Sequence, residues 1–390
     1  MTSIAKALFF IAMVLVGTGV DIYAARIGAP GAGLHIGVAF VALAALSYVT
    51  VYRKVIDLRY AYLVGLLFFA LIGWSLFSTM QAADTALGLI TITRYLVIFA
   101  TAAILIGMAG SERDINDVLI AGVHWSIYIL VATIAFDLIQ PGTFSKQLTR
   151  PAGLPENPNG ASQALAMLFT MLILLERGRG LNRKFILAGA LVAMGMLATL
   201  SRGGVIMMMV LTASTLFFKA PKSRNIVLPI TAVILVGAAI FVFQAMDSAA
   251  YVQNQTTLNR MQRLTDLSYY TDTSDSRYRL VQMYFASASP IFGAGPGASS
   301  IVEDFGGATH NTFIKLYWET GMIACVLYVA MILAPLAWSR SWEVVVAVLI
   351  LGLLSVLTNY NMDNRLFVTT VFLAYLVARR HHLDRLVSGK

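Results

Sequence analysis

The sequence predicts an all-α, polytopic membrane protein with about twelve transmembrane helices. Of its 390 residues, 58% are hydrophobic and only 12% are charged, about half the charged share of a typical soluble domain. Apolar runs long enough to cross a hydrocarbon layer of roughly 30 Å recur from end to end. Each crossing must be helical, because a lipid-exposed backbone group without a partner costs several kcal/mol. We therefore expect one polytopic membrane domain over residues 1–390.

The apolar runs define the expected helices, and polar or Gly- and Pro-rich residues separate them. The expected spans are residues 4–20, 34–52, 60–77, 87–109, 117–139, 161–176, 185–200, 203–218, 226–245, 312–336, 343–359 and 365–379. The first run follows one basic residue, Lys6, and ends without a clear small-residue cleavage site, so we expect a retained helix. The TLSRGG segment between the seventh and eighth spans is so short that these two helices should form a hairpin.

The placement of basic residues predicts the orientation of the chain. When both termini are cytoplasmic, the inner loops hold most of the Lys and Arg residues, including YRKVIDLR, ERGRGLNRK, KAPKSRN and the tail RRHHLDRLVSGK. This distribution follows the positive-inside rule of bacterial inner-membrane proteins. It makes residues 246–311 one large loop on the periplasmic side. The net charge of +9 then reflects the basic inner loops, which contact membrane lipids. We expect no nucleic-acid binding.

Histidine and cysteine usage predicts neither a metal site nor a cofactor. The five histidines, His35, His124, His310, His381 and His382, are scattered and form no HxxxH or HExxH pattern. The single Cys325 lies inside an apolar run. The GAGPG segment lacks the Lys-Ser/Thr ending of a phosphate-binding P-loop, so it is better interpreted as a turn. Tryptophans near span ends, such as Trp74 and Trp318, fit an interfacial belt.

His310 is the strongest candidate for acid–base chemistry. It stands at the end of the long loop, in THNTFIKLYWETG, next to where the tenth span should begin. A neutral imidazole can take a proton from a hydroxyl group; the alternative is a histidine that caps or anchors a helix at the interface. Glu319 follows nine residues later. If the helix starts near Asn311, this carboxylate should lie more than two turns deep, where it could orient a partner or balance an arginine.

Several arginines lie on the side of the membrane where the positive-inside rule disfavours them. Arg202 lies in the predicted hairpin, Arg277 and Arg279 in the long loop, and Arg150 in the other sizeable outer loop. The planar guanidinium fork matches phosphate oxygens, so arginines at headgroup level suggest an anionic phosphate ligand. The alternative is that they bind ordinary lipid headgroups or pair with acidic residues of the loop.

Arg94 lies well inside a span, in ITITRYLVIF, and must face protein or a water-filled cavity. An ionisable residue in such a place is a functional candidate. The structural alternative is a buried pair with Asp84, Asp137 or Glu319, and the sequence does not decide between the two.

Three segments, taken in order, resemble the O-antigen ligase/polymerase superfamily of bacterial membrane glycosyltransferases, with the ligase branch the most similar. RPAGLPENPNGASQ resembles the segment that precedes a span in that family, and TLSRGG resembles its hairpin. The third segment, SRYRL…SPIFGAGPG…THNTFIKLYWETG, resembles its Arg, P-x-x-G-x-G and H-N-x-(F/L)-x-x-x-x-x-E-x-G signature. The resemblance covers the chain from about Arg150 to Ile323.

The resemblance implies a GT-C-like helical fold, no metal, and transfer of glycan from undecaprenyl diphosphate with inversion at the anomeric carbon. It makes His310 the catalytic histidine and assigns diphosphate binding to Arg202 and to Arg277 or Arg279. Arg94, Arg150, Asn311 and Glu319 would support them. A ligase would transfer the polymer to a lipid A core sugar, whereas a polymerase would use a lipid-linked repeat, and a third relative glycosylates protein hydroxyls.

An alternative from a different class is a secondary transporter or flippase with Arg94 and Glu319 as midplane gates. Such proteins typically consist of two similar halves with broken spans at matching places. This sequence shows no internal repeat and gathers its polar residues at one membrane face, which favours the glycosyltransferase.

Overall fold

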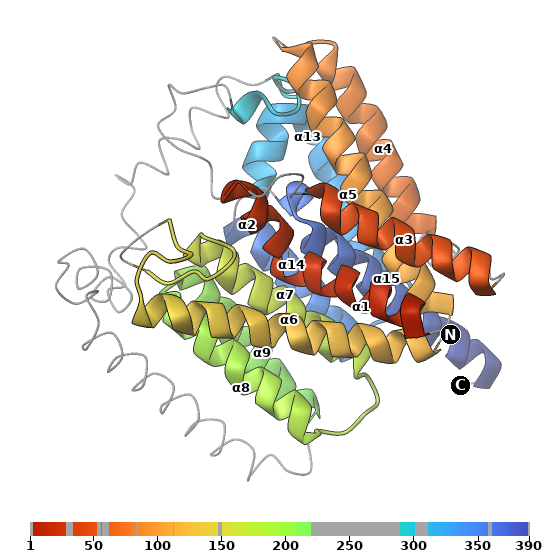
Figure 1. Cartoon of the computed structure of the whole chain (residues 1–390). Coiled ribbons are helices and arrows are strands. Elements are labelled where there is room, and N and C mark those ends of the chain that lie inside the picture. The colour runs from red at the N-terminus through yellow and green to blue at the C-terminus, as the bar shows by residue number, and fades with distance from the viewer. Residues whose placement is uncertain are drawn as a thin grey trace. The chain divides into compact units, whose positions relative to one another are not determined.

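The described part of the chain is helical. The computed structural model describes residues 3–28, 34–52, 56, 62–82, 84–111, 113–146, 150–219, 289–300, 311–357 and 361–388 (Figure 1). Eleven of the twelve expected spans coincide with helices in these residues, and the remaining one, residues 226–245, lies outside them. The periplasmic-loop prediction for residues 246–311 also lies largely outside them, apart from residues 289–300 and Asn311.

The helices form two compact units, each built from two separate stretches of the chain. The first unit contains α1 (Ser3–Thr18), α2 (Val20–Arg26), α3 (Leu34–Tyr52), α6 (Arg113–Ile139), α7 (Pro158–Leu175), α8 (Arg183–Ala198) and α9 (Arg202–Lys219). The second contains α4 (Tyr62–Thr79), α5 (Thr85–Ser111), η3 (Ala298–Ser300), α13 (Thr312–Leu333), η5 (Ala334–Ala337), α14 (Trp342–Leu357), η6 (Asn361–Asp363) and α15 (Arg365–Ser388). The expectation of a single domain over the whole chain stays a prediction.

In the first unit, α7 is the most enclosed helix and packs against α1, α6, α8 and α9. The α1–α6 contact is close because small residues face it: a Cβ at Gly122 would lie 2.9 Å from the Met13 side chain. Small residues commonly mediate such close helix packing in membrane proteins. Helices α8 and α9 are joined by three residues, so the hairpin predicted from TLSRGG is confirmed.

In the second unit, α15 is buried on all sides from Leu366 to Ala378. Aromatic contacts join it to its neighbours: Phe372 packs edge-to-face against Phe99 of α5, and Phe367 stacks on Tyr328 of α13. The Tyr328 hydroxyl also pairs with Ser355 Oγ of α14 at 2.7 Å.

Large apolar side chains are exposed on most helices, including Leu66 and Phe69 of α4 and Leu89 and Ile90 of α5. A water-soluble protein rarely exposes apolar surface on this scale. Among the described residues, five helical segments are long and apolar enough to cross a membrane: Tyr62–Thr79, Thr85–Gly110, Asp114–Ile139, Pro158–Leu175 and Thr312–Ala337. The protein is therefore membrane-embedded, although the last of these five segments is not one straight crossing, as described below.

Candidate functional site

Helix α13 is a helical hairpin and not a straight rod. Gly321 inside it has φ 80° and ψ −176°, which interrupts the helix. The Cys325 thiol donates to the Phe313 carbonyl oxygen at 3.4 Å, and the Phe313 and Tyr328 rings lie 5.6 Å apart. In a straight helix, residues 12 apart would be separated by about 18 Å. Residues 312–320 and 322–333 therefore run antiparallel as two arms.

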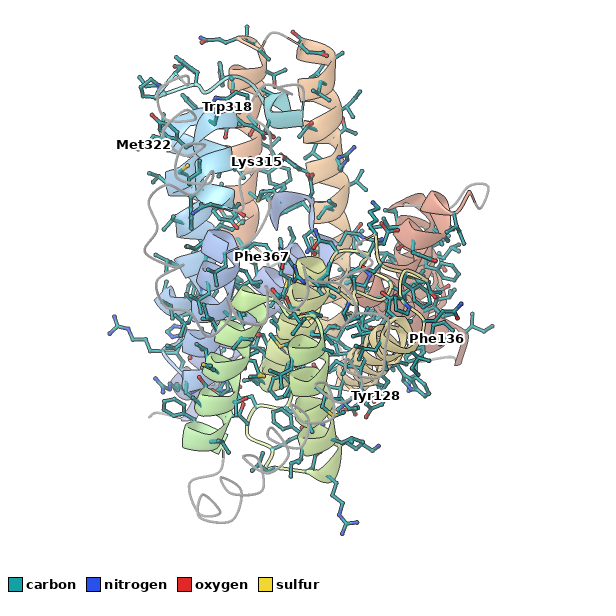
Figure 2. All side chains as sticks on the ribbon, turned by 90° about the vertical axis from the view of Figure 1, so that its left-hand side faces the viewer. Tyr128, Phe136, Lys315, Trp318, Met322 and Phe367 are labelled. Atoms are coloured by element: carbon teal, nitrogen blue, oxygen red, sulfur yellow. The ribbon has the colours of Figure 1, made fainter. Side chains whose placement is uncertain are left out.

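This geometry corrects the expected single straight span over residues 312–336, while Glu319 lies more than two turns after Asn311, as expected. Glu319 lies beside the tip of the hairpin, and the first arm begins at the level of Cys325 and Tyr328. Figure 2 shows this order, with Trp318 near the upper end of the unit, Lys315 lower and Phe367 lower still. The cause is the positive φ of Gly321, a conformation that glycine adopts without a Cβ penalty.

The Gly- and Pro-rich loop, residues 289–297, docks onto this tip and satisfies the backbone groups that the break exposes. Ala294 N donates to Trp318 O and Gly295 N to Glu319 O, both at 2.8 Å, while Met322 N donates to Pro290 O at 2.9 Å. The approach requires glycine on both sides. A Cβ at Gly293 would overlap the Glu319 backbone, and one at Gly321 would overlap the Ile291 carbonyl.

Helix α4 completes the tip. Trp74 Nε1 donates to Thr320 O at 2.8 Å, and its ring stacks on Phe292 at 5.3 Å. Ser78 Oγ donates to the carbonyls of Phe292 and Glu319. The interfacial-belt interpretation of Trp74 and Trp318 is therefore incomplete: Trp74 holds the hairpin, and Trp318 is only 4% exposed.

The Glu319 carboxyl group is fully buried against the same loop. Its Oε1 accepts hydrogen bonds from Ser299 Oγ at 2.5 Å and from Ser299 N at 3.4 Å, and the Gly297 backbone adds a further bond. Lys315, one turn earlier on the same arm, places its Nζ 3.9 Å from Oε1. The P-x-x-G-x-G and E-x-G segments are thus two halves of one interlocked structure.

The other end of the first arm, its foot, is charged. Asn311 is the N-cap of α13, and its Oδ1 accepts from Phe313 N at 2.9 Å and Ile314 N at 3.1 Å. Arg94 of α5 and Lys315 both lie within electrostatic range of Asp363 in η6. Asp363 as a residue is exposed, but protein atoms around its carboxyl group exclude water, and this desolvation raises its pKa. The positive charges of Lys315 and Arg94 lower the pKa and so oppose the effect.

The charge of Arg94 thus acts on Asp363, a carboxyl group that the sequence did not suggest. Two of the three expected partners are engaged elsewhere. Asp84 Oδ1 accepts from Leu87 N at the start of α5. Asp137 accepts from backbone groups of the loop that follows α6, including Ala152 N at 3.0 Å and Gly153 N at 3.1 Å.

In the first unit, Arg150 joins two of the resembling segments. Its guanidinium is buried and donates from Nε to Thr199 O at 3.0 Å and from Nη2 to Asn159 Oδ1 at 3.1 Å. Thr199 begins TLSRGG, and Asn159 belongs to NPNG. These bonds give Arg150 a structural task, and its expected role in ligand binding stays a prediction. Arg202 begins α9 next to this connection, and its side chain lies outside the described residues.

Three predicted site residues, His310, Arg277 and Arg279, lie outside the described residues, so their roles also stay predictions. Three other residues were missed by the sequence analysis. Lys315 could have been found from its i,i+4 spacing to Glu319. Ser299 and Asp363 gave no such signal, because tertiary packing alone brings them to the first arm.

No group of three or more His, Cys, Asp or Glu side chains that could hold a metal ion occurs in the described part of the chain. His124 is buried, and its Nε2 lies 3.5 Å from Glu176 Oε1.

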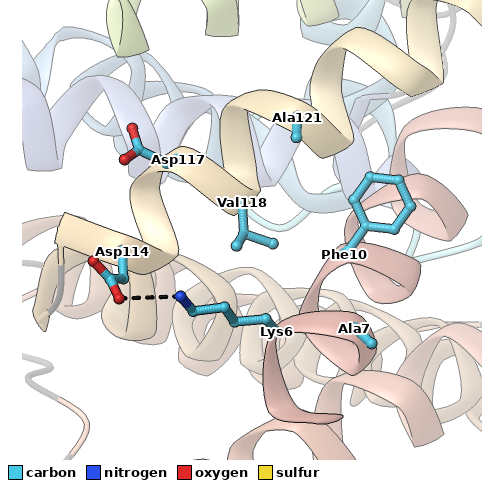
Figure 3. Close-up of a pocket in the computed structure, with 7 residues that line it drawn as sticks. All are labelled: Lys6, Ala7, Phe10, Asp114, Asp117, Val118 and Ala121. Atoms are coloured by element: carbon cyan, nitrogen blue, oxygen red, sulfur yellow. Dashed lines mark hydrogen bonds and ion pairs between the residues drawn. The ribbon is translucent and has the colours of Figure 1, made fainter. Parts of the chain in front are cut away.

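An open groove on the first unit lies between α1 and α6, where Lys6 pairs with Asp114 at 3.1 Å (Figure 3). It contains none of the predicted site residues.

Residues 185–329 match the family described as O-antigen ligase. No curated protein matches the chain. The matched range contains Arg202, His310, Lys315 and Glu319 together with the glycine loop, whereas Arg94, Arg150 and Asp363 lie beyond it.

Proposed function

Since residues 185–329 place this membrane-embedded chain in the O-antigen ligase superfamily, we propose that it transfers glycan from undecaprenyl diphosphate to a lipid A core sugar hydroxyl at the periplasmic face of the bacterial inner membrane. A function of the O-antigen ligase or polymerase type follows from the family. The specific donor, acceptor, location and metal-independent inverting mechanism are the proposal.

The observation that supports this proposal best is the folded-back first arm of α13. Its foot carries Asn311, and His310 directly precedes this residue in the sequence. Its tip is clamped by the glycine loop through Glu319. A clamped rod of nine residues, about 14 Å long, is a rigid support for a catalytic residue at its start, and rigid support of this kind is what a catalytic constellation needs.

The proposed chemistry assigns one task to each group. His310 accepts the proton of the acceptor hydroxyl as that oxygen attacks C1 of the donor sugar. The bond from C1 to the diphosphate breaks, and negative charge develops on the leaving diphosphate. Arg202 and Arg277 or Arg279 stabilise this charge as fixed guanidinium groups that need no reorganisation. Backside attack inverts the anomeric carbon.

The first test is genetic. We expect a strain that lacks the protein to accumulate long polymer on undecaprenyl diphosphate while its lipid A core stays bare, as seen on gels of surface glycolipid and carrier-linked glycan. Wild-type protein should restore the normal pattern, whereas His310→Ala and Arg202→Ala should fail to restore it, with transfer reduced at least about 100-fold.

Matched controls are His382→Ala and Arg340→Ala, which change the same residue types outside the proposed site. Both should restore transfer, and all variants should reach the membrane in equal amounts. Wild-type transfer by His310→Ala or Arg202→Ala would reject the role given to that residue. Unchanged glycan profiles in the deletion strain would reject the polysaccharide function altogether.

The same gels separate the second candidate, a polymerase that uses a lipid-linked repeat as acceptor. The family match does not distinguish the ligase from the polymerase. If the deletion strain attaches only single repeats to the core, the protein is the polymerase; if the long polymer stays on its carrier, it is the ligase.

A further inference from the structure

The groove between α1 and α6 combines an apolar floor with a charged rim (Figure 3). It has a volume of about 450 Å³, within the range of roughly 300–1,000 Å³ that small-molecule sites occupy. Its lining consists of Ala7 and Phe10 of α1, Val118 and Ala121 of α6, and the charged residues Lys6, Asp114 and Asp117. A hollow with both kinds of surface fits an amphiphile better than a purely polar ligand.

The order of charged and apolar residues along the groove indicates a membrane lipid. Asp114 is the first residue of a segment long and apolar enough to cross a membrane, and Lys6 lies in the first turn of α1. A Cβ at Gly122 would lie 3.7 Å from Phe10 O, so both helices run in the same direction from the Lys6–Asp114 pair. The charged end therefore lies at headgroup level, and the apolar floor lies deeper in the membrane.

The charges of the rim are balanced and exposed. Lys6 Nζ lies 3.1 Å from Asp114 Oδ2, and Arg179 Nη2 lies 3.2 Å from Asp117 Oδ1. Both carboxylate side chains are 59% exposed, and exposed ion pairs of this kind contribute little to stability. A ligand that offers each charge a new partner can therefore separate Lys6 from Asp114. A zwitterionic headgroup does so, since its phosphate pairs with the lysine and its ammonium with the carboxylate.

We propose that this groove binds an aminophospholipid of the phosphatidylethanolamine type, with its phosphate on Lys6, its primary ammonium on Asp114 and an acyl chain over Phe10. A primary ammonium donates up to three hydrogen bonds to carboxylates, whereas the quaternary ammonium of phosphatidylcholine donates none. Asp114 and Asp117 together disfavour an anionic headgroup by charge repulsion. Binding at this site is independent of the proposed transfer reaction and is measured without it.

The test is native mass spectrometry of the purified full-length protein in detergent, titrated with dioleoyl phosphatidylethanolamine. We expect a saturable adduct, and about ten-fold weaker binding of dioleoyl phosphatidylcholine and dioleoyl phosphatidylglycerol. Asp114→Asn should weaken binding of phosphatidylethanolamine about ten-fold without weakening that of phosphatidylcholine, because it removes the partner of the primary ammonium. Lys6→Met should weaken binding of both, because both lipids carry the phosphate.

Ala121→Leu fills the apolar floor without changing a charge and should abolish the adduct. The matched controls are Ala132→Leu, at an exposed position of the same helix, and Asp384→Asn, at an exposed carboxylate of α15. Neither control should change the affinity for phosphatidylethanolamine. Thermal unfolding of each variant identifies any loss of fold, and if Asp114→Asn does not fold, Ala121→Leu still decides whether the groove is the site.

A crosslinking experiment locates the bound lipid. Phosphatidylethanolamine with a diazirine near the start of one acyl chain should label peptides that contain Phe10 or Val118. Labelling confined to other helices would reject the site.

Three further results would overturn the proposal. Equal affinities for the three lipids, together with wild-type affinity in Asp114→Asn and Ala121→Leu, would show lipid bound only along the general apolar surface. Tighter binding of phosphatidylglycerol would assign the groove to an anionic headgroup. A protein dimer that Ala121→Leu dissociates would place a second copy of the chain in the groove.

Discussion

Asp363, in the turn before α15, is a carboxyl group whose pKa is shifted by its surroundings. Its carboxyl has a pKa raised above the ordinary value of 3.8, with desolvation as the main cause. Above the raised pKa the carboxylate is ionised and attracts the charges of Arg94 and Lys315; below it the neutral acid does not. The charges that face it are those of Arg94 on α5 and of Lys315 and Glu319 on α13.

At the scale of residues, the sequence pointed to two residues of the hairpin region but did not indicate the partner of Arg94. Asn311 and Glu319 were singled out from their place beside His310, and the structure gives both a definite contact. The partner of Arg94 was missed because Asp363 lies far away in the sequence and follows no periodic pattern. A side chain that is brought near by tertiary packing leaves no signal in local spacing.

At the scale of elements, the hairpin of α13 depends on one glycine. Gly321→Ala would place a residue with a Cβ at φ 80° and would overlap the Ile291 carbonyl. Unfavourable backbone conformations of this kind cost about 1–3 kcal/mol before any steric overlap is added. We expect this variant to lower the unfolding temperature of the purified protein by several degrees and to reduce transfer.

The matched control is Gly352→Ala in α14, where an added Cβ would meet nothing within 4 Å. That variant should be as stable as wild type or slightly more stable, because alanine is the better helix former. Equal unfolding temperatures for the two variants would mean that the break at Gly321 is not required.

The length of the apolar runs predicted where helices occur, but it did not predict that α13 folds back on itself. The apolar stretch from Thr312 to Ala337 is long enough to cross a membrane by composition. It folds back because Gly321 can adopt a positive φ and because a distant loop supplies the donors Ala294 N and Gly295 N. The hydrophobic composition of the segment indicates neither the backbone conformation of Gly321 nor the docking of this loop.

At the scale of the whole molecule, the predicted orientation can be measured with introduced cysteines. Cys325 is the only natural cysteine and would first be replaced by Ser. We expect Met80→Cys, in the exposed turn after α4, to react with a membrane-impermeant maleimide in intact cells whose outer membrane is permeable to it. The inner-loop variant Gly180→Cys should react only after the inner membrane is opened.

The opposite labelling pattern would invert the topology and move the glycine loop to the cytoplasmic side, where the proposed reaction does not take place. Labelling of both positions in intact cells would show that the reagent had entered the cytoplasm, and a less permeant maleimide would then be used.

The contact between Cys325 and the Phe313 carbonyl allows opening of the hairpin to be measured by the reaction of this thiol. Because this sulfur lies between the two arms, a thiol reagent reaches it fully only while they separate. The alkylation rate of a single native atom thus measures how often the first arm swings away, without any added label. Binding of a ligand at the start of the first arm should therefore change the alkylation rate of Cys325.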